Sequence, residues 1–442
     1  MKLIGRRARA VCICGAALVV SALPPSAARA QTSAAGPALG IAARFTLADA
    51  AALARRQHPM LSAAGGRRRA ISGTARQEAA LPNPVFEWRR ENLGSTLQRD
   101  EFMSATLPVD LYGRRVALRS AAGQAMRRAV ADSSATARDV EFDVARAYWR
   151  TALALALRSA AGAQRGAVDT IARIEEERAR QGAVPEGSAL RARLEADRAR
   201  LTELSARAEV ERARGDLARA LALPLDSVPL PSETVAVDTL SAVPGMAGLL
   251  AFARGHRPEL SAARARVDES TTRRLAERLG TLPGVGVQAG SKRTSGVLTG
   301  TVQVGVSLPF FDRNGGNRER AEGDVLMAQG VLRATEAQVE AEVLGAARAY
   351  LLLVEDFARA TGTTAGGPRD FDARGRTIAD IALTAWREGA ITLFELLDTE
   401  RLHADVRAAA LRAATDVHLA RLDLARALGL AVDAPLPAGA SR

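Results

Sequence analysis

The chain contains one series of short motifs twice, with about 200 residues between the two sets. The first set is Leu81-Pro82, Leu107-Pro108, Ala145-Arg146-Ala147-Tyr148, Gly182-Ala183 and Asp216-Leu217-Ala218-Arg219-Ala220-Leu221. The second set is Leu282-Pro283, Leu308-Pro309, Ala347-Arg348-Ala349-Tyr350, Gly389-Ala390 and Asp423-Leu424-Ala425-Arg426-Ala427-Leu428. The offsets are 201, 201, 202, 207 and 207, so the order is kept with one small insertion. A duplication of this length predicts two structural repeats, residues 45–223 and 246–430, each running long helix, strand pair, long helix.

The N-terminus has the pattern of a secretory signal. Basic residues precede an apolar stretch from Val11 to Leu23, and Ala28-Arg29-Ala30 fits a small-residue cleavage site. The apolar stretch is short for a spanning helix, which disfavours the alternative of a retained membrane anchor. We therefore predict a signal peptide at residues 1–30. The chain's two cysteines, Cys12 and Cys14, lie inside it, so we expect no disulfide, thiolate chemistry or cysteine metal site in the mature chain.

The charge balance does not favour a nucleic-acid partner. The formal net charge of +12 falls to +7 without the five basic residues of the signal. The remaining arginines alternate with acids along helical segments, as in Glu175-Glu176-Glu177-Arg178, which is typical of a solvated helix face. No run of 18 or more apolar residues follows the signal, so we expect no spanning helix.

Long segments without proline predict long helices. We expect one helical stretch from Thr46 to about Ala80, ended by Leu81-Pro82-Asn83-Pro84. Another runs from Arg114 to about Arg180, and its 67 positions would reach on the order of 100 Å. The second copy repeats this from about Gly316 to Ala360 and from Phe371 to Leu428, with a Gly/Thr-rich insertion, Thr361 to Pro368, between.

Side-chain patterns suggest how these helices pack. Val140, Val144 and Tyr148 mark one apolar stripe. After the break at Gly182 to Gly187, a second stripe with mostly heptad-like spacing comprises Leu190, Leu194, Leu201, Leu204 and Ala208, and we expect it to be a packing seam. Glu176–Arg180 and Glu203–Arg207 are spaced to form i,i+4 ion pairs on the exposed face.

Two segments of each copy change from helical to strand character. Residues 85–109 and 284–309 each offer two runs of about ten residues, the length of a tilted strand in a bilayer. In the second pair Val302, Val304 and Val306 alternate with small or polar residues, and Arg293 to Gly296 is the expected turn. This alternation fits a membrane hairpin and equally fits a hairpin packed on a soluble core. In the first pair the alternation is irregular.

No constellation of catalytic or cofactor-binding residues is evident. The four histidines, His58, His256, His403 and His418, lack ligand spacing, and no phosphate or dinucleotide loop occurs. We therefore expect no catalytic residue, no cofactor and no metal site. The acids of most interest are Glu395 and Asp398, which share a helix face just after Gly389. They are an ordinary amphipathic turn in a monomer, and they form acidic rings in a symmetric assembly.

The motifs in both copies resemble those of the outer-membrane efflux protein family, the TolC family. The resemblance rests on Phe45-Thr46-Leu47, His58-Pro59, Leu81-Pro82-Asn83-Pro84, Leu308-Pro309-Phe310-Phe311, the segment from Trp386 to Asp398, and the duplication itself. It is strongest for the branch that serves heavy-metal and drug pumps of the resistance-nodulation-division (RND) type.

The resemblance implies a fold that is mainly α with membrane β-strands, in which duplicated helix–hairpin–helix units form a trimeric 12-stranded β-barrel and a long periplasmic α-helical barrel. It implies one outer-membrane channel domain extending into the periplasm, with an equatorial layer near Thr361 to Asp370. The tips at Gly182 and Gly389 would form the periplasmic entrance and dock an adaptor, and Glu395 and Asp398 would form its gate.

The function implied by the resemblance is a passive exit duct for small solutes, either metal ions or drugs, rather than an enzyme. Its partners would be two further copies of the chain, a periplasmic adaptor (membrane fusion protein), an inner-membrane RND-type pump and outer-membrane lipid. Two alternatives remain: a channel of a type I protein secretion system and a soluble periplasmic coiled-coil scaffold.

Overall fold

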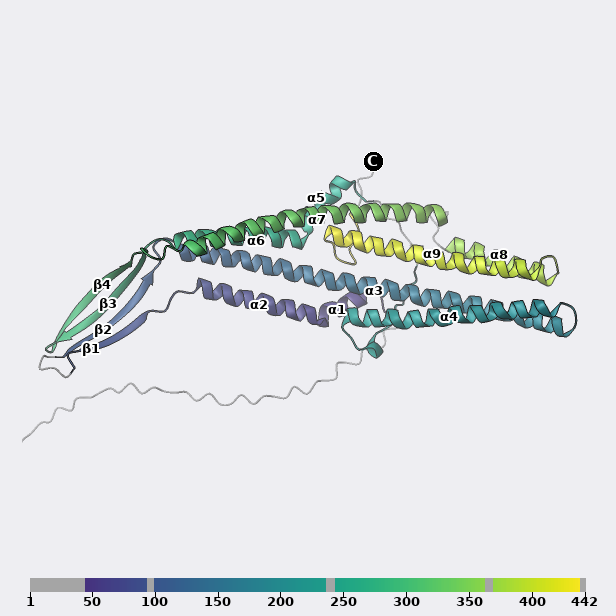
Figure 1. The fold of residues 1–442 in the computed structure, drawn as a ribbon, viewed down its shortest axis with the longest axis horizontal. Coiled ribbons are helices and arrows are strands. Elements are labelled where there is room, and N and C mark those ends of the chain that lie inside the picture. The colour runs from purple at the N-terminus through teal and green to yellow at the C-terminus, as the bar shows by residue number, and fades with distance from the viewer. Residues whose placement is uncertain (1–43, 94–98, 236–242, 362–368, 438–442) are drawn as a thin grey trace, which may run out of the picture. The chain divides into compact units, whose positions relative to one another are not determined.

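The structure is a computed structural model that describes residues 44–93, 99–235, 243–361 and 369–437 (Figure 1). The predicted signal at residues 1–30 and the insertion Thr361 to Pro368 with its equatorial layer fall almost wholly outside these ranges. Residues Ala43–Arg442 form one compact unit, which is described below.

The described helices and strands follow one order twice. The first copy comprises α1 (Leu47–Gln57), α2 (Pro59–Ala79), β1 (Val85–Glu91), β2 (Asp100–Val109), α3 (Arg114–Arg180) and α4 (Glu186–Leu221). The second copy comprises α5 (Met246–His256), α6 (Pro258–Leu279), β3 (Gly284–Thr294), β4 (Val297–Ser307), α7 (Gly315–Thr361), α8 (Arg369–Arg387) and α9 (Leu393–Leu428). A short 3-10 helix, Leu225–Ser227, follows α4. The single helix α3 thus corresponds to α7 and α8 together.

The first helical stretch is two helices rather than the one expected from Thr46 to Ala80. His58 is extended, at φ −65° and ψ 127°, and its ring Nδ1 accepts a hydrogen bond from the backbone N–H of Met60 at 3.2 Å. Proline disfavours helical geometry in the residue before it and is favoured at the first position of a helix. Pro59 therefore ends α1 and starts α2.

The four strands form one antiparallel sheet in the order β1-β2-β3-β4. Both predicted strand pairs are confirmed, but the second turn is tighter than expected. Thr294 pairs with Val297, so only Ser295 (φ 53°) and Gly296 (φ 86°) form the turn. Two consecutive residues with positive φ give the hairpin turn whose twist matches the strands.

The register places apolar residues of all four strands on one face. Phe86 lies opposite Ala105, Ala105 opposite Ala289, and Ala289 opposite Val302. Directly opposed residues point to the same side of a sheet. The face, called here the apolar sheet face, comprises Phe86, Trp88, Met103, Ala105, Leu107, Val285, Val287, Ala289, Val302, Val304 and Val306. None of the described helices packs extensively on it, and most of these side chains are exposed.

The opposite face of the sheet is polar. The side-chain amide of Gln288 donates to the hydroxyl of Ser104 at 2.6 Å, and Lys292 Nζ lies 3.1 Å from Asp100. Phe102 also lies on this face, where the Arg89 guanidinium is 4.6 Å from its ring centre. This cation–π contact accounts for the irregular alternation of the first strand pair.

The helical core is centred on α3, which packs against α2, α4, α6 and α9. The predicted stripe of Val140, Val144 and Tyr148 is buried. The Tyr148 hydroxyl donates to the carbonyl oxygen of Phe45 at 2.9 Å. Trp149 stacks on the His418 ring of α9 with ring centres 3.9 Å apart, so the core joins the two copies.

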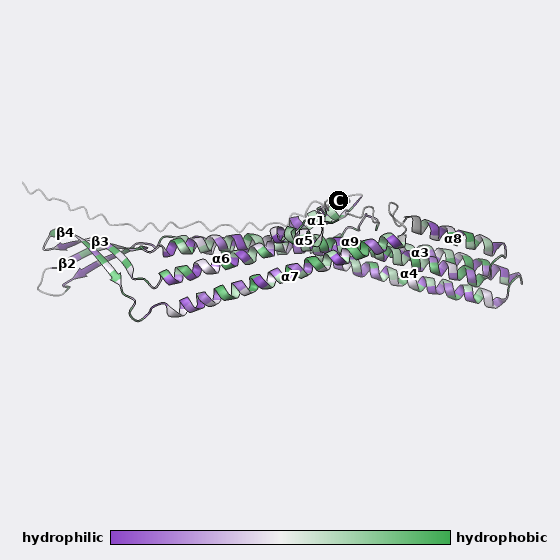
Figure 2. Cartoon of the chain, turned by 90° about the horizontal axis from the view of Figure 1, so that it is seen from above, coloured by the Kyte–Doolittle hydropathy of each residue, from purple (hydrophilic) through white to green (hydrophobic). Residues whose placement is uncertain are grey.

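Figure 2 shows hydrophilic and hydrophobic residues mixed along the labelled helices. Within the described ranges, no helix combines the length and the apolar character needed to cross a membrane.

The expected leucine seam of α4 is wrong. The residues that α4 buries near its start are Ala189, Ala192, Ala196 and Ala199. The leucines at 190, 194, 201 and 204 are all at least 60% exposed within the chain. Small side chains let two helix backbones approach closely, so α4 presents its alanine face to its neighbours in the chain and leaves its leucine face free.

One of the two expected ion pairs forms. Arg207 binds Glu203, which is buried rather than exposed as expected. Glu176 instead lies 3.6 Å from Arg193 of α4, and Arg180 pairs with Glu177 at 3.0 Å. An opposite charge on the adjacent helix can lie as close as one four residues away on the same helix. The i,i+4 spacing therefore does not reveal which of the two partners an acid takes.

Candidate functional site

Each pair of long helices ends in the same tight turn. Gly182 (φ 71°) follows α3 and Gly389 (φ 76°) follows α8, so both adopt the left-handed conformation that favours glycine. The backbone N–H of Ala183 donates to Arg178 at 2.8 Å, and that of Ala390 donates to Ala385 at 2.8 Å. These 6→1 hydrogen bonds satisfy carbonyl groups at the helix ends, as in a Schellman motif.

The two turns are held near each other by an apolar cluster, called here the tip cluster. It contains Val168, Ile171, Ala172, Ala192, Ala196, Ala382, Trp386, Leu396 and Leu397, which come from α3, α4, α8 and α9. The guanidinium of Arg178 lies 4.5 Å from the Trp386 ring centre. All four helices that carry the turns are therefore packed together close to them.

Glu395 has a structural role that was not predicted, although Thr392 and Glu395 have the Thr-x-x-Glu spacing of a capping box. Its carboxylate accepts hydrogen bonds from the backbone N–H of Thr392 at 2.7 Å and from the Thr392 hydroxyl at 3.0 Å, and the Glu395 N–H donates back to that hydroxyl. This capping box starts α9. The hydrogen bond from the Thr392 backbone, followed by that from its hydroxyl, lowers the pKa of Glu395. Glu395 is thus held as an exposed carboxylate.

Asp398 lies one turn further along α9 and is also exposed. Its near neighbour Arg401 forms an ion pair with Glu195 of α4, which raises the pKa of Arg401, and the charge of Asp398 adds a smaller effect in the same direction. The structure therefore places both predicted acids, Glu395 and Asp398, in solvent on the first two turns of α9.

Glu400 is an acid of this region that the sequence analysis missed. It is 8% exposed, and burial raises its pKa, with a further contribution from Asp380 of α8. A signal for it was available, because Glu400 follows Leu396 by four residues and Leu397 by three, and so continues the buried stripe of α9. The helix α9 thus presents the exposed acids Glu395 and Asp398 outward and the buried carboxyl of Glu400 inward.

The two copies differ in charge at these positions. At an offset of 207, the counterparts of Glu395, Asp398 and Glu400 are Ser188, Arg191 and Arg193. The acidic character therefore belongs to the α8–α9 turn alone.

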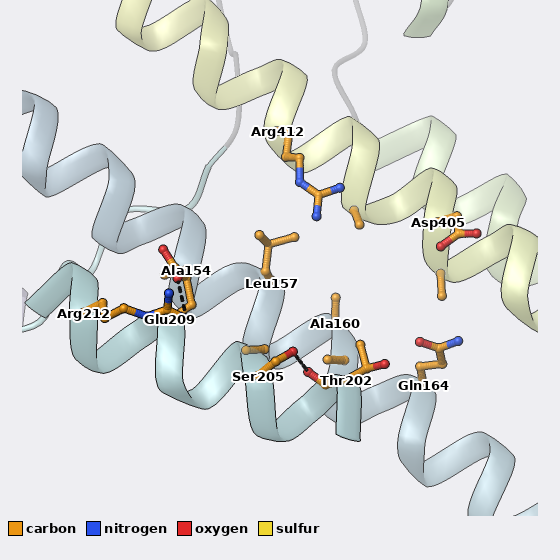
Figure 3. A pocket seen from close by; sticks show the side chains of 14 residues that line it. Ala154, Leu157, Ala160, Gln164, Thr202, Ser205, Glu209, Arg212, Asp405 and Arg412 are labelled. Carbon is orange, nitrogen blue, oxygen red and sulfur yellow. Dashed lines mark hydrogen bonds and ion pairs between the residues drawn. The ribbon is translucent and has the colours of Figure 1, made fainter. Parts of the chain in front are cut away.

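A hollow of about 380 Å³ lies between the α3–α4 pair and α9 (Figure 3). Much of its wall is alanine, with Thr202 and Ser205 on α4 and Asp405 and Arg412 on α9. These polar groups belong to different helices and do not converge on one point in the close-up. The hollow is consistent with loose packing at an alanine-rich seam rather than with a catalytic pocket.

The histidines take part in local packing. His58 caps α2, His256 stacks on Phe252 at 3.9 Å and His418 stacks on Trp149. The Cδ2 of His403 lies 2.7 Å from where a side chain at Gly375 would begin. Among the described residues, no three His, Cys, Asp or Glu side chains are grouped as metal ligands.

The fold is similar to those of solved outer-membrane channels. The VceC outer membrane protein of Vibrio cholerae aligns with a TM-score of 0.70 at 19% identity, over 88% of this chain and 97% of VceC. The CmeC outer membrane channel of Campylobacter jejuni gives 0.71 at 16% identity, over 88% and 87%. The open-state MtrE outer membrane channel of Neisseria gonorrhoeae gives 0.70 at 19% identity, over 87% and 89%.

A family model matches the second copy of the duplication. Residues 249–430 match the model of the outer membrane efflux protein family. No curated protein matches the chain significantly. The second copy thus matches this family, in agreement with the resemblance inferred from the motifs.

The buried acid gives a pH-dependent prediction. The carboxyl of Glu400 has a higher pKa in the folded protein than in the unfolded chain. As pH rises above the unfolded pKa, the unfolded chain loses this proton more readily, so the free energy of unfolding falls. Glu400→Gln should therefore raise the melting temperature at pH 8 and have little effect near pH 4, measured by circular dichroism. The exposed tip residue Glu388, changed to Gln, is the control and should show no such difference. An equal shift for Glu400→Gln at both pH values would contradict the assignment.

Proposed function

We propose that this chain is the outer-membrane exit duct of a tripartite efflux system. It conducts small solutes, metal ions or drugs, passively from an inner-membrane RND-type pump and a periplasmic adaptor to the exterior. The family match over residues 249–430 carries the proposal, supported by the channel fold of the whole described chain. In this proposal the energy comes from the pump, and the part of the chain that the structure describes shows no convergent catalytic site.

The sheet supports insertion into the outer membrane as part of a larger assembly. Strands β1 and β4 are the two ends of the sheet, so among the described residues each leaves one edge without a strand partner. Open strand edges are not tolerated in lipid, because each unpaired backbone group costs several kcal/mol there. A homotrimer of such sheets gives a closed barrel of 12 strands, with the apolar sheet face against lipid and the polar face lining the lumen.

The helix tips supply the proposed periplasmic entrance. The turns at Gly182 and Gly389 are the proposed docking points for the adaptor. Glu395 and Asp398 form the proposed gate, because threefold symmetry brings six carboxylates around one axis. Like charges at short range favour bound cations or partial protonation, so such a ring attracts cations to the entrance.

Two other functions have less support. A soluble scaffold does not explain why eleven apolar positions on four strands face outward uncovered. A type I secretion channel uses the same fold with a different pump, and the electrical measurement below, together with co-purification of the pump, separates it from the proposed duct.

The membrane assignment makes a prediction about two adjacent residues of β4. Val304→Arg puts a charge on the apolar sheet face and should cost roughly 2–4 kcal/mol near the bilayer midplane. Gln303→Arg, one residue earlier on the polar face, should cost far less and is the matched control. The amount of each variant in outer-membrane fractions measures the difference. Equal recovery of both variants would show that the face of Val304 does not meet lipid.

The gate makes a prediction about conductance. Glutamine can also serve at the third position of a capping box, so Glu395→Gln with Asp398→Asn removes both charges while keeping the start of α9. In planar bilayers this double variant should conduct more than the wild type and be blocked less by divalent cations added from the periplasmic side.

A cap variant controls for damage to the turn. Thr392→Ala breaks the capping box, at a cost of about 1 kcal/mol, but retains both charges, so it should keep cation block. The gate assignment is wrong if the charge-neutral double variant keeps the conductance, the ion selectivity and the divalent block of the wild type.

A further inference from the structure

The apolar sheet face ends in charged side chains. On β1, Phe86 and Trp88 are followed on the same side by Arg90, because alternate residues of a strand share a face. The register places Arg90 opposite Glu101 of β2, and Glu101 opposite Arg293 of β3. Directly opposed residues also share a face. Arg90, Glu101 and Arg293, called here the outer charged row, therefore continue the apolar sheet face across three strands.

The outer charged row lies at the end of the sheet where the hairpins turn. The four connections between strands and helices are all at the other end, where β1 and β3 begin and β2 and β4 end. In the proposed duct the helices extend into the periplasm. The outer charged row then lies on the exterior side of the outer membrane.

The depth of the row agrees with the thickness of the apolar band. Arg293 follows Val285, the first apolar residue of β3 on this face, by eight residues. That is about 26 Å along the strand, or roughly 20 Å along the membrane normal at a tilt of about 40°. The lipid-facing band of a membrane barrel is about 25 Å tall. The row is thus placed at the headgroup layer of the outer leaflet rather than among acyl chains.

The outer charged row has more positive than negative charge. Its two arginines and one glutamate leave a net charge of +1. Glu101 forms an ion pair with Arg90. Arg293 is exposed, and its side chain has no ion pair or hydrogen bond with the residues that the structure describes. One guanidinium of the row is therefore available to an anion from outside the chain.

The polar face balances its cations at the same height. Lys292 Nζ lies 3.1 Å from Asp100, and the guanidinium of Arg89 lies 3.3 Å from Glu91. Each cation on this face has a carboxylate of its own. The surplus of positive charge is therefore confined to the face proposed to meet lipid.

An aromatic side chain lies beside the row, one step nearer the membrane centre. The Arg90 guanidinium is 5.3 Å from the ring centre of Trp88, which is exposed on the apolar sheet face. Tryptophan is enriched where acyl chains meet headgroups. Trp88 thus supports the same depth for the row as the length of β3 does.

We infer that the outer charged row binds a phosphate group of a phosphorylated glycolipid of the lipid A class in the outer leaflet. The guanidinium groups of Arg90 and Arg293 donate hydrogen bonds to the phosphate oxygens, for which their planar fork is suited. The acyl chains of the same lipid lie along the apolar sheet face. This inference rests on the proposed function, because it requires the sheet to lie in the outer membrane.

Two double variants with the same loss of charge test the site. Arg90→Gln with Arg293→Gln removes both cations of the outer charged row. Arg89→Gln with Lys292→Gln removes the adjacent cations of the same two strands on the polar face and is the matched control. Native mass spectrometry of protein purified in mild detergent measures the fraction that retains added lipid A. The row variant should bind lipid A roughly tenfold more weakly than the wild type, and the control should bind it as the wild type does.

The choice of lipid tests the chemistry. The wild type should retain lipid A better than its dephosphorylated form and better than phosphatidylglycerol, and an excess of inorganic phosphate should leave lipid A bound. Equal retention of dephosphorylated lipid A contradicts recognition of the phosphate. Stronger retention of phosphatidylglycerol contradicts the assignment to the outer-leaflet glycolipid. Displacement by inorganic phosphate shows that the row is a site for a free anion and contradicts a lipid site.

The site and the duct can fail separately. Both double variants should be recovered from outer-membrane fractions, since charges near the interface cost a barrel little. If the wild type is recovered there and conducts ions, but the two double variants bind lipid A equally, the lipid site is wrong and the duct remains. If the wild type is absent from outer-membrane fractions, the duct and the lipid site are both wrong.

Discussion

Close packing on the uninterrupted helix α3 is the constraint on which the rest of the structure depends. Helices α2, α4, α6 and α9 all lie against it, and its seams are largely alanine. Small seam residues permit several helices to approach one axis, but they bury little apolar area each, so stability comes from length and from a few large side chains. Tyr148 is one of these large side chains. Its buried hydroxyl donates to the carbonyl oxygen of Phe45, and leaving either group without its hydrogen-bond partner would cost about 1–3 kcal/mol.

The duplication explains how this packing serves a duct. The copies keep the same residue types at positions that the first copy uses in its core, as at Arg146 and Arg348 or at Ile171 and Ile378. They differ at the turn where solute would enter, since the counterparts of Glu395 and Asp398 are Ser188 and Arg191. This local difference gives the proposed entrance its charge.

Much of the fold could be predicted from the sequence because proline, glycine and length carry most of the information. The absence of proline predicted α3 with its observed ends, and the positions of Gly182 and Gly389 predicted the two turns. The alternation of apolar and polar residues predicted β4. In the first strand pair only the observed register shows which side chains share a face, because Phe102 packs against the Arg89 guanidinium on the polar face. What a single helix cannot reveal is which of its faces meets a neighbour. The leucine face of α4 and the partner of Glu176 were mistaken for that reason, and the burial of Glu400 and the capping role of Glu395 were missed.

In the proposed assembly a single chain is incomplete, since the sheet formed by the described strands has two open edges. The most direct test is the mass of the protein extracted from outer membranes in mild detergent, measured by light scattering with the detergent mass subtracted. The account predicts a single species containing three chains. A monodisperse single chain, folded and extracted from the same membranes, would contradict it.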